Sequence, residues 1–512
     1  MINNLFYNIR NFFIAKFNNN ISLIIIFFIL SRIIYLYFFK IIFDISTVNY
    51  YWQFFPKNTL NQDLFTSLFY NFYQPPLLNL IYGLLLKLTI YYSFYIQIIY
   101  LLSSVISFVF FYKILVELKF NNTFSCILTC LFMIWPTTIL YENHFYKEHL
   151  VMFFLTLSVF FSIKIIKYPH ISVNYFFFSL FIILLSLTRE TFNIFWIYFF
   201  FLFLLIITKQ YKKIILFFLF INLFVLPFYL KNYFLYNNFS INLAPWENLS
   251  QKIEFVKEMK DPNRHKLIKS YFFKNSESFD KLENTMSVIY NVPLNSGPNE
   301  YNKYLHYKYK YNHPLLKSDS YFNEIYLKVE EARKNDFLKV FKNHPGLIFI
   351  SFSNAFVRHF FRSSDTFAFV KNNADKMPFL IKISHCVKLT LACVFEFDLD
   401  TKVANDRNYS TYLDKNFDKS QYLYKIKSSL NDINFILIFL YIALFFYFFK
   451  NLLQKKNQRI DYLINFWFVS FLFIFFILIF FEDGEIPRHR YPFDYLSFLF
   501  FLYFKKNSKK KS

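Results

Sequence analysis

Glycine and cysteine are scarce in this chain of 512 residues, which contains only four of each. With so few glycines, the chain has no glycine-rich loop that could cradle the phosphates of a nucleotide. The cysteines give no sign of a disulfide framework. Cys126 and Cys130 lie four positions apart in an apolar run. We expect them to pack on one helix face, because a metal site would need further His or Cys ligands nearby.

Acidic residues are also few, with 33 Asp and Glu against 56 Lys and Arg and a formal net charge of +23. Such an excess can indicate nucleic-acid binding. Short basic loops between apolar runs, however, mark the cytoplasmic side of a membrane protein. The basic residues follow that pattern, at Arg10 and Lys16, Lys113 and Lys119, Lys164 and Lys167, Lys209, Lys212 and Lys213, Lys450, Lys455, Lys456 and Arg459, and from Lys505 to Lys511. We therefore interpret the charge as topology and expect no nucleic-acid partner.

Hydrophobic residues are abundant, at 56% of the chain, and aromatic residues alone make up 25%. A soluble domain does not have enough interior to bury that much apolar surface. The sequence predicts an all-α polytopic membrane protein with about 10–13 transmembrane helices and a small α-rich external domain. The expected spans are 21–43, 94–112, 123–141, 149–166, 172–188, 191–207, 214–230, 433–449, 462–481 and 492–504, with weaker candidates at 346–362 and 379–396.

The segment 76–91 decides the sidedness of the later loops. If it crosses the membrane, the basic loops that follow fall on the wrong side; if it is re-entrant or interfacial, they all fall in the cytoplasm. We prefer the second interpretation, with an uncleaved first span. The polar stretches then share the other face, which corresponds to the periplasmic side of a bacterial inner membrane.

This topology divides the chain into three parts. Residues 1–230 form an N-terminal transmembrane catalytic module with a first external loop at 44–75. Residues 231–345 form an external segment, in which Glu324 to Phe341 reads as an amphipathic helix. Residues 346–512 form a C-terminal transmembrane module with a basic cytoplasmic tail.

Polar residues that topology does not explain gather on the expected outer face. Asp44 follows the first span, where its carboxylate could act as a general base. Arg189 lies beside Glu190 between two apolar runs, and guanidinium groups suit phosphate. Against the positive-inside preference, one more cluster of charges precedes the last span: Glu485, Arg488, His489 and Arg490.

Three further acids are candidates for a second carboxylate near Asp44. Asp63 lies in the same loop, and Glu142 and Glu148 lie in a short loop dense in charge. His144 could bind a metal ion together with Glu148, although one His and one acid are few ligands. The requirement for a divalent metal ion therefore stays open, and no other cofactor is expected.

Transfer of a sugar from a lipid phosphate suits this set of residues. Hydrolysis of a glycoside requires two carboxylates, because the leaving alkoxide must be protonated. A phosphate already leaves as a stable anion. One base for the acceptor and cations for the phosphate then suffice.

The pattern resembles the GT-C membrane glycosyltransferases, in particular bacterial proteins related to glycosyltransferase family 39 and the protein mannosyltransferases. The resemblance rests on short motifs: Asp44, Gln74-Pro75-Pro76-Leu77, Trp135-Pro136 with Tyr141-Glu142-Asn143, and Glu485 through Asp494. It implies a polyprenyl-phosphate-linked sugar as donor, a glycan, lipid or protein as acceptor, and the first-loop acid as catalytic base. Family members often carry a second acid there, whereas Ile45 follows Asp44 here.

Two alternatives remain open. An O-antigen ligase or polymerase also has many spans and a large external loop, and it uses a lipid-linked oligosaccharide. A flippase or transporter of lipid-linked sugars would place charges inside its spans and show a repeat across its halves. The chain has no evident repeat, and its charges gather toward one face, which disfavours transport.

Overall fold

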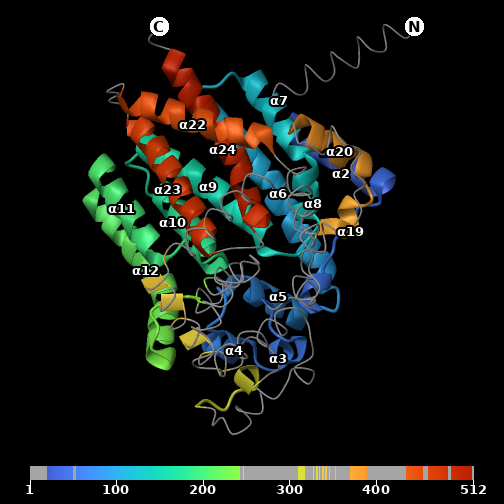
Figure 1. The fold of residues 1–512 in the computed structure, drawn as a ribbon, viewed down its shortest axis with the longest axis vertical. Coiled ribbons are helices and arrows are strands. Elements are labelled where there is room, and N and C mark those ends of the chain that lie inside the picture. The colour runs from blue at the N-terminus through green and yellow to red at the C-terminus, as the bar shows by residue number, and fades with distance from the viewer. Residues whose placement is uncertain are drawn as a thin grey trace.

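The computed structural model describes residues 20–49, 53–242, 310–317, 370–388, 434–453, 459–481 and 486–509, together with single positions between 246 and 352. Within these ranges the regular structure is helical, and there is no strand apart from one isolated bridge between Asp44 and His144. The expectation of an all-α fold is confirmed for this part of the chain. Figure 1 shows the helices as one bundle with a group of short helices beneath it.

Five helices of the described chain are long and apolar enough to cross a membrane. Their sequences hold runs of apolar residues with almost no charge, which favours helices whose backbone groups bond internally. They are α2 (Asn20–Phe39), α6 (Tyr92–Glu117), α9 (Lys147–Lys167), α12 (Tyr211–Tyr236) and α23 (Arg459–Phe481). The chain leaves α2 at Lys40 and α12 at Asn237 through left-handed residues, with φ of 52° and 55°, a common way to end a helix.

A sixth candidate span is broken. Helices α7 (Asn122–Met133) and α8 (Pro136–Glu142) meet at an angle of 60°. Pro136 lacks a backbone N–H and therefore cannot continue the hydrogen-bond ladder of α7. The span expected at 123–141 is thus two helices, and α8 turns Glu142 toward the bundle.

The remaining apolar helices agree in position with the other expected spans, although crossing of a membrane stays a prediction for them. They are α10 (Ser172–Thr188), α11 (Ile194–Thr208), α22 (Phe435–Leu453) and α24 (Ile486–Lys509). In the segment 76–91 the structure has α5 (Leu77–Leu88), which at 12 residues is about 18 Å long. Because a bilayer core is about 30 Å thick, this length suits an interfacial or re-entrant element.

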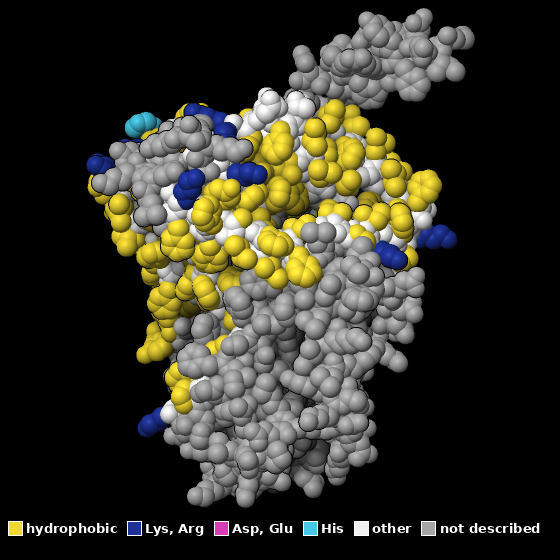
Figure 2. Space-filling model, turned by 45° about the horizontal axis from the view of Figure 1, so that its top comes forward, with side chains coloured by type: hydrophobic (Ala, Val, Ile, Leu, Met, Phe, Trp, Pro, Cys, Tyr) yellow, Lys and Arg dark blue, Asp and Glu magenta, His cyan; other side chains and the backbone are white. Residues whose placement is uncertain are grey.

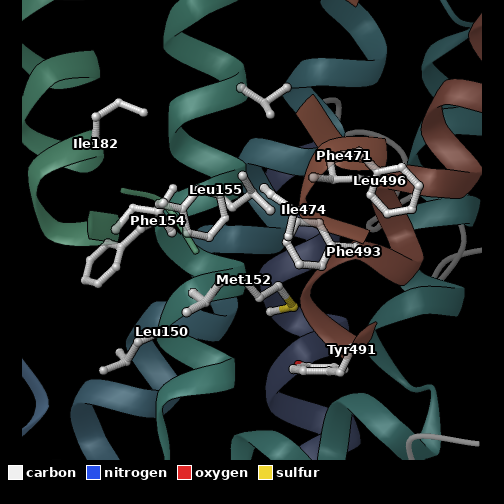
Figure 3. Packing of buried hydrophobic residues seen from close by; sticks show 14 of the residues in the cluster. Leu150, Met152, Phe154, Leu155, Ile182, Phe471, Ile474, Tyr491, Phe493 and Leu496 are labelled. Atoms are coloured by element: carbon white, nitrogen blue, oxygen red, sulfur yellow. The ribbon is translucent and has the colours of Figure 1, made fainter. Parts of the chain in front are cut away.

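Helix α9 forms the centre of the bundle. It packs against α10 and α6 and also contacts α24 and α23. Two of its apolar side chains, Met152 and Leu155, lie toward Phe493 and Leu496 of α24 (Figure 3). A polar side chain of α9 also bonds a neighbouring helix: Ser162 accepts a hydrogen bond of 2.9 Å from the indole of Trp467 in α23. The core therefore joins the N-terminal and C-terminal parts of the chain.

The outer helices carry apolar side chains on their exposed faces. In α2, Ile29, Leu30 and Phe38 are more than half exposed, and in α12 Leu216 and Leu223 are as well. Figure 2 shows apolar side chains over most of the described surface on its face. A soluble protein does not expose apolar surface on this scale, which supports a membrane protein.

Short elements lie below the bundle in Figure 1. They are α3 (Lys57–Gln62) and α4 (Leu64–Tyr70), whereas α19 (Lys371–Ala374) and α20 (Pro378–Val387) lie along the side of the bundle. The 3-10 helix η3 (Pro314–Lys317) contacts α4, and η1 (Ser46–Asn49) follows Asp44. Asn79 of α5 fastens the first loop, because its side chain bonds the Phe55 amide at 2.9 Å and the Gln53 carbonyl at 3.0 Å. Asn79 thereby holds the loop against α5.

The described residues cover only part of three further predicted segments. In the predicted amphipathic helix the described positions from Leu327 to Lys342 are helical, and Phe337 is buried. Of the weaker spans, 379–396 begins as α20 and then passes beyond the described residues, as does nearly all of 346–362. Cys126 and Cys130 are free, whereas Cys386 is disulfide-bonded.

Candidate functional site

The Asp44 loop is tied to the segment that follows α8. The Asp44 amide donates to the Asn143 carbonyl at 2.8 Å, and the Phe145 amide donates to the Asp44 carbonyl at 2.8 Å. Thr47 adds a hydrogen bond of 3.0 Å from its hydroxyl to the Phe145 carbonyl. These bonds join residues about 100 positions apart in sequence, so the first loop and the 142–149 segment form one unit.

The Asp44 carboxylate itself is half-buried. Its Oδ1 accepts a hydrogen bond of 2.8 Å from the Ser46 amide, which is the turn that Asp commonly makes with the backbone two residues later. Among the described residues no cation forms an ion pair with Asp44. The carboxylate is therefore held in place by the backbone rather than neutralised by an arginine or lysine of the described chain.

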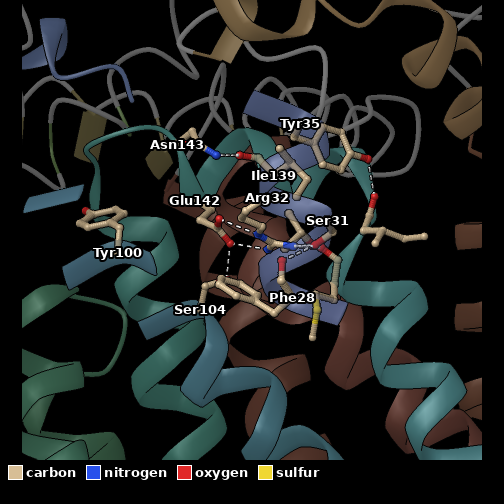
Figure 4. Close-up of polar contacts among 12 residues, drawn as sticks. Phe28, Ser31, Arg32, Tyr35, Tyr100, Ser104, Ile139, Glu142 and Asn143 are labelled. Atoms are coloured by element: carbon tan, nitrogen blue, oxygen red, sulfur yellow. Dashed lines mark hydrogen bonds and ion pairs between the residues drawn. The ribbon is translucent and has the colours of Figure 1, made fainter. Parts of the chain in front are cut away.

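Glu142, expected as a second acid, is engaged in an ion pair. Arg32 of α2 reaches it with two bonds, Nε to Oε1 at 2.9 Å and Nη2 to Oε2 at 2.5 Å. The hydroxyl of Ser104 in α6 donates to the same carboxylate. The Glu142 side chain is fully buried, and Figure 4 shows its contacts with Arg32 and Ser104. The structure thus places Glu142 as the ion-pair partner of Arg32, and its use as a second acid stays a prediction.

Glu148 and Arg189 meet at the start of α9. Their side chains are both fully buried, and Arg189 Nη1 lies 3.9 Å from Glu148 Oε1. Lys147 lies beside them, with its Nζ 3.6 Å from Glu190 Oε2 and 3.5 Å from Gln74 Oε1. Residues expected separately from three loops, Gln74, Glu148 and Arg189, thus join one buried polar cluster.

A second set of polar groups lies between α6, α9 and α24. His149 contacts the Tyr491 hydroxyl through Nδ1 at 3.3 Å and the Tyr100 carbonyl through Nε2 at 3.2 Å. Tyr491 also stacks on Tyr141, with ring centroids 4.3 Å apart. Tyr100 in turn donates to the Tyr146 carbonyl at 2.5 Å. The start of α24 is therefore fixed against the 142–149 segment.

The motif Gln74-Pro75-Pro76 turns the chain into α5. All three residues are buried, and the side chain of Asn71 closes the turn by bonding the Gln74 carbonyl at 2.5 Å and the Gln74 amide at 3.4 Å. Only Gln74 has a side chain that contacts the polar cluster. The two prolines shape the loop and offer no hydrogen-bond donor.

The structure describes only one side chain, that of Arg490, from the predicted cluster Glu485, Arg488, His489 and Arg490. Arg490 is buried, and its Nε lies 3.2 Å from Asp494 Oδ1, one turn later in α24. Glu485 and the side chains of Arg488 and His489 lie outside the described residues. Of this group, Arg490 is the residue whose side chain is described, and it precedes Tyr491 of the second set of polar groups.

Asp63, another candidate second acid, lies at the start of α4. It caps α4, where its side chain accepts a hydrogen bond of 3.2 Å from the Thr66 amide. Hydrogen bonds from the Thr66 side chain and amide lower the pKa of this exposed carboxyl. The structure thus gives Asp63 a capping function and no contact with Asp44.

His144 is buried and faces Asp44 across the bridge. In the described part of the chain, however, no three His, Cys, Asp or Glu side chains gather into a group that could hold a metal ion. A pairing of His144 with Glu148 alone is too small a ligand set for a metal-dependent step to be derived.

At the opposite end of α9 the ion pairs are partly exposed. Glu117 contacts Lys164 and Lys167, at 2.7 Å for Lys167, and these side chains are about one-fifth exposed. Lys506 donates to the carbonyls of Leu118 and Lys119. Lys213 reaches the carbonyl of His170 in the same way. Four of the basic segments predicted to share one side of the membrane therefore meet at one end of the bundle.

Figure 2 brings the upper part of the molecule toward the viewer. Dark-blue Lys and Arg side chains lie among the apolar ones, and no Asp or Glu is visible on the described surface of this face. We call this region the basic end and the region around Asp44, Glu142, Lys147, Glu148 and Arg189 the polar end. At 21 residues, α9 separates the two ends by about 30 Å.

Arg32, Lys147 and His149 belong to the polar end but were not among the predicted site residues. Arg32 could have been recognised, since it is the only charge in the apolar run from Leu23 to Phe39. A lone charge in such a run needs a buried partner. No sequence pattern marks His149 as a site residue, because it is a single His at the start of an apolar helix.

Comparison with protein-family models, curated proteins and solved structures finds no match to this chain.

Proposed function

We propose that the protein is an integral membrane glycosyltransferase that transfers a sugar from a polyprenyl phosphate to an acceptor on the non-cytoplasmic face. Asp44 would be the general base. The observation that carries the proposal is the bridge from Asp44 to the 142–149 segment, which also holds the buried cation Lys147 beside Arg189. The proposed base and candidate cations for the phosphate are thereby attached to one hydrogen-bonded unit.

The reaction that we propose needs little from the protein. Asp44 takes the proton of the acceptor hydroxyl as its oxygen forms a bond to the anomeric carbon of the sugar. The bond from that carbon to the phosphate oxygen breaks, and the phosphate keeps the electron pair. Fixed positive groups near the phosphate stabilise the charge that develops there. Lys147, Arg189 and Arg490 are the candidates for that role among the described residues.

The matched test compares two acids of the same loop. Asp44→Asn keeps the turn with Ser46, because an Asn side chain can accept the same backbone hydrogen bond, but it cannot take a proton. Asp63→Asn keeps the cap of α4, since Asn caps helices as well as Asp. We expect Asp44→Asn to lower turnover by about 10²–10⁴-fold and Asp63→Asn to leave it unchanged.

The measurement is loss of radiolabel from polyprenyl-phosphate hexoses and pentoses, with purified protein in nanodiscs and native membranes as the source of acceptor. A parallel assay with a diphosphate-linked oligosaccharide tests the ligase or polymerase alternative. Wild-type turnover in Asp44→Asn would remove Asp44 as the base.

One observation favours a second candidate, a transporter of lipid-linked sugars. The broken helix pair α7 and α8 ends at an ion pair buried between helices, and discontinuous helices with interior charges occur in transporters. Movement of a fluorescent polyprenyl-phosphate sugar across sealed vesicles, without transfer of its sugar, would support this function over glycosyl transfer.

A further inference from the structure

The Arg32–Glu142 pair lies next to the Asp44 bridge in the chain. Glu142 is the last residue of α8, and the next residue, Asn143, accepts the hydrogen bond from the Asp44 amide. Arg32 comes from the middle of α2, whose end leads directly into the Asp44 loop. A single ion pair thus joins both chain segments that form the bridge.

The geometry of the pair restricts both partners. The two parallel bonds between Arg32 and Glu142, at 2.9 and 2.5 Å, fix orientation as well as distance. Arg32 Nη1 also donates to the Met133 carbonyl at 3.1 Å. This carbonyl ends α7 just before the bend. Arg32 therefore holds α7, the bend and α8 in one arrangement.

We infer that Arg32 is a positioning residue: by clamping Glu142 it fixes the 142–145 segment and so sets the position of the Asp44 carboxylate. This inference rests on the proposed function for its effect on turnover. It does not rest on that function for its structural part, which is that loss of Arg32 loosens the bridge between Asp44 and Phe145.

The first test measures the bridge itself. Hydrogen exchange of peptides covering 40–49 and 142–150 is compared between wild type and Arg32→Gln in nanodiscs. We expect exchange at both peptides to accelerate at least tenfold in Arg32→Gln. The control is Lys164→Gln, which breaks an ion pair with Glu117 at the basic end and should leave both peptides unchanged. Wild-type exchange in Arg32→Gln would overturn the inference.

Two more variants separate positioning from a general loss of stability. The double variant Arg32→Gln with Glu142→Gln leaves no uncompensated charge in the protein interior, so its melting temperature should recover toward wild type. The clamp is still absent, so exchange at the bridge should stay fast. Arg32→Lys keeps the charge without the paired bonds, and we expect intermediate exchange. Slow exchange in the double variant would show that the clamp is dispensable.

Turnover gives the functional arm. If Asp44 is the base, Arg32→Gln should lower kcat by about tenfold or more through misplacement of the carboxylate, with KM for the donor changed less than about twofold. The double variant Arg32→Gln with Glu142→Gln should have a melting temperature near that of wild type. An equal loss of kcat in this variant supports positioning by Arg32, and full recovery of kcat contradicts it. If wild-type protein transfers no sugar, the proposed function fails, and the exchange experiment still decides the role of Arg32.

Discussion

The charged side chains at the two ends of α9 differ in burial. At the polar end, Glu142, Glu148 and Arg189 are fully buried and opposite charges meet inside the bundle. At the basic end, Lys164 and Lys167 are partly exposed around Glu117. The predicted membrane topology would account for the basic end, since lysines in short loops are typical of the cytoplasmic side. It does not account for buried pairs, whose desolvation is costly.

On this interpretation, the basic end carries charge that would orient the protein in a membrane, and the polar end carries charge that holds distant segments together. Solvated lysines serve the first purpose with little structural precision. Buried, hydrogen-bonded pairs bring together segments that are far apart in sequence, as Arg32 does with Glu142. We therefore expect substitutions at the two ends to differ in magnitude.

The largest effect should follow from Arg32→Leu. It leaves the Glu142 carboxylate fully buried without its guanidinium partner, and breaking a buried pair in this way costs about 3–5 kcal/mol of stability. Unfolding of the purified protein in mild detergent, followed by circular dichroism, measures this loss. A change below about 1 kcal/mol would mean that water or another cation reaches Glu142.

A smaller effect should follow from Tyr491→Phe. The variant keeps the ring that stacks on Tyr141 but removes the hydroxyl that contacts His149 Nδ1 at 3.3 Å. An unsatisfied buried polar group costs about 1–3 kcal/mol. The same unfolding experiment applies, and Tyr491→Leu, which also removes the stacking, should be less stable than Tyr491→Phe. Equal stability of the two variants would count against the contribution of the ring.

Lys164→Gln should have little effect on stability. Partly exposed ion pairs contribute about 0–1 kcal/mol, and Lys167 still contacts Glu117 at 2.7 Å. If Lys164→Gln lowered the free energy of unfolding as much as Arg32→Leu, ion pairs at the two ends would not differ in their contribution to stability.

The smallest effect concerns pH and the segment 310–317 next to α4. Burial lowers the pKa of His313 below its usual 6.5, and the nearby Asp63 opposes that shift. The folded state therefore resists protonation of His313. Its contribution to stability is complete above pH 6.5 and decreases as the pH falls below that value. Between pH 7.5 and 5, the melting temperature of wild type should fall slightly more than that of His313→Gln. An equal fall would show that the pKa of His313 does not differ between the folded and unfolded states.

The helical fold was largely predictable from the sequence, because long apolar runs such as 149–166 leave few alternatives to a helix. The bend before Pro136 was not predicted, since the apolar run continues through it.

The candidate site was predictable in part. The sequence predicted Asp44, Gln74, Glu148 and Arg189 as site residues. The structure brings the side chains of Gln74, Glu148 and Arg189 into one polar cluster, and Asp44 is tied to the 142–149 segment through backbone hydrogen bonds. The pairing of Arg32 with Glu142 depends on packing between α2 and α8, which no local pattern encodes.

The placement of the two ends on opposite sides of a membrane is tested most directly by labelling of single cysteines. In a background without the four native cysteines, Asn61→Cys near the polar end and Lys212→Cys near the basic end replace exposed residues. Intact cells with a permeable outer envelope are treated with a membrane-impermeant maleimide. We expect Asn61→Cys to be labelled and Lys212→Cys to be labelled only after lysis. Labelling of Lys212→Cys in intact cells, or protection of Asn61→Cys, would contradict a site on the non-cytoplasmic face.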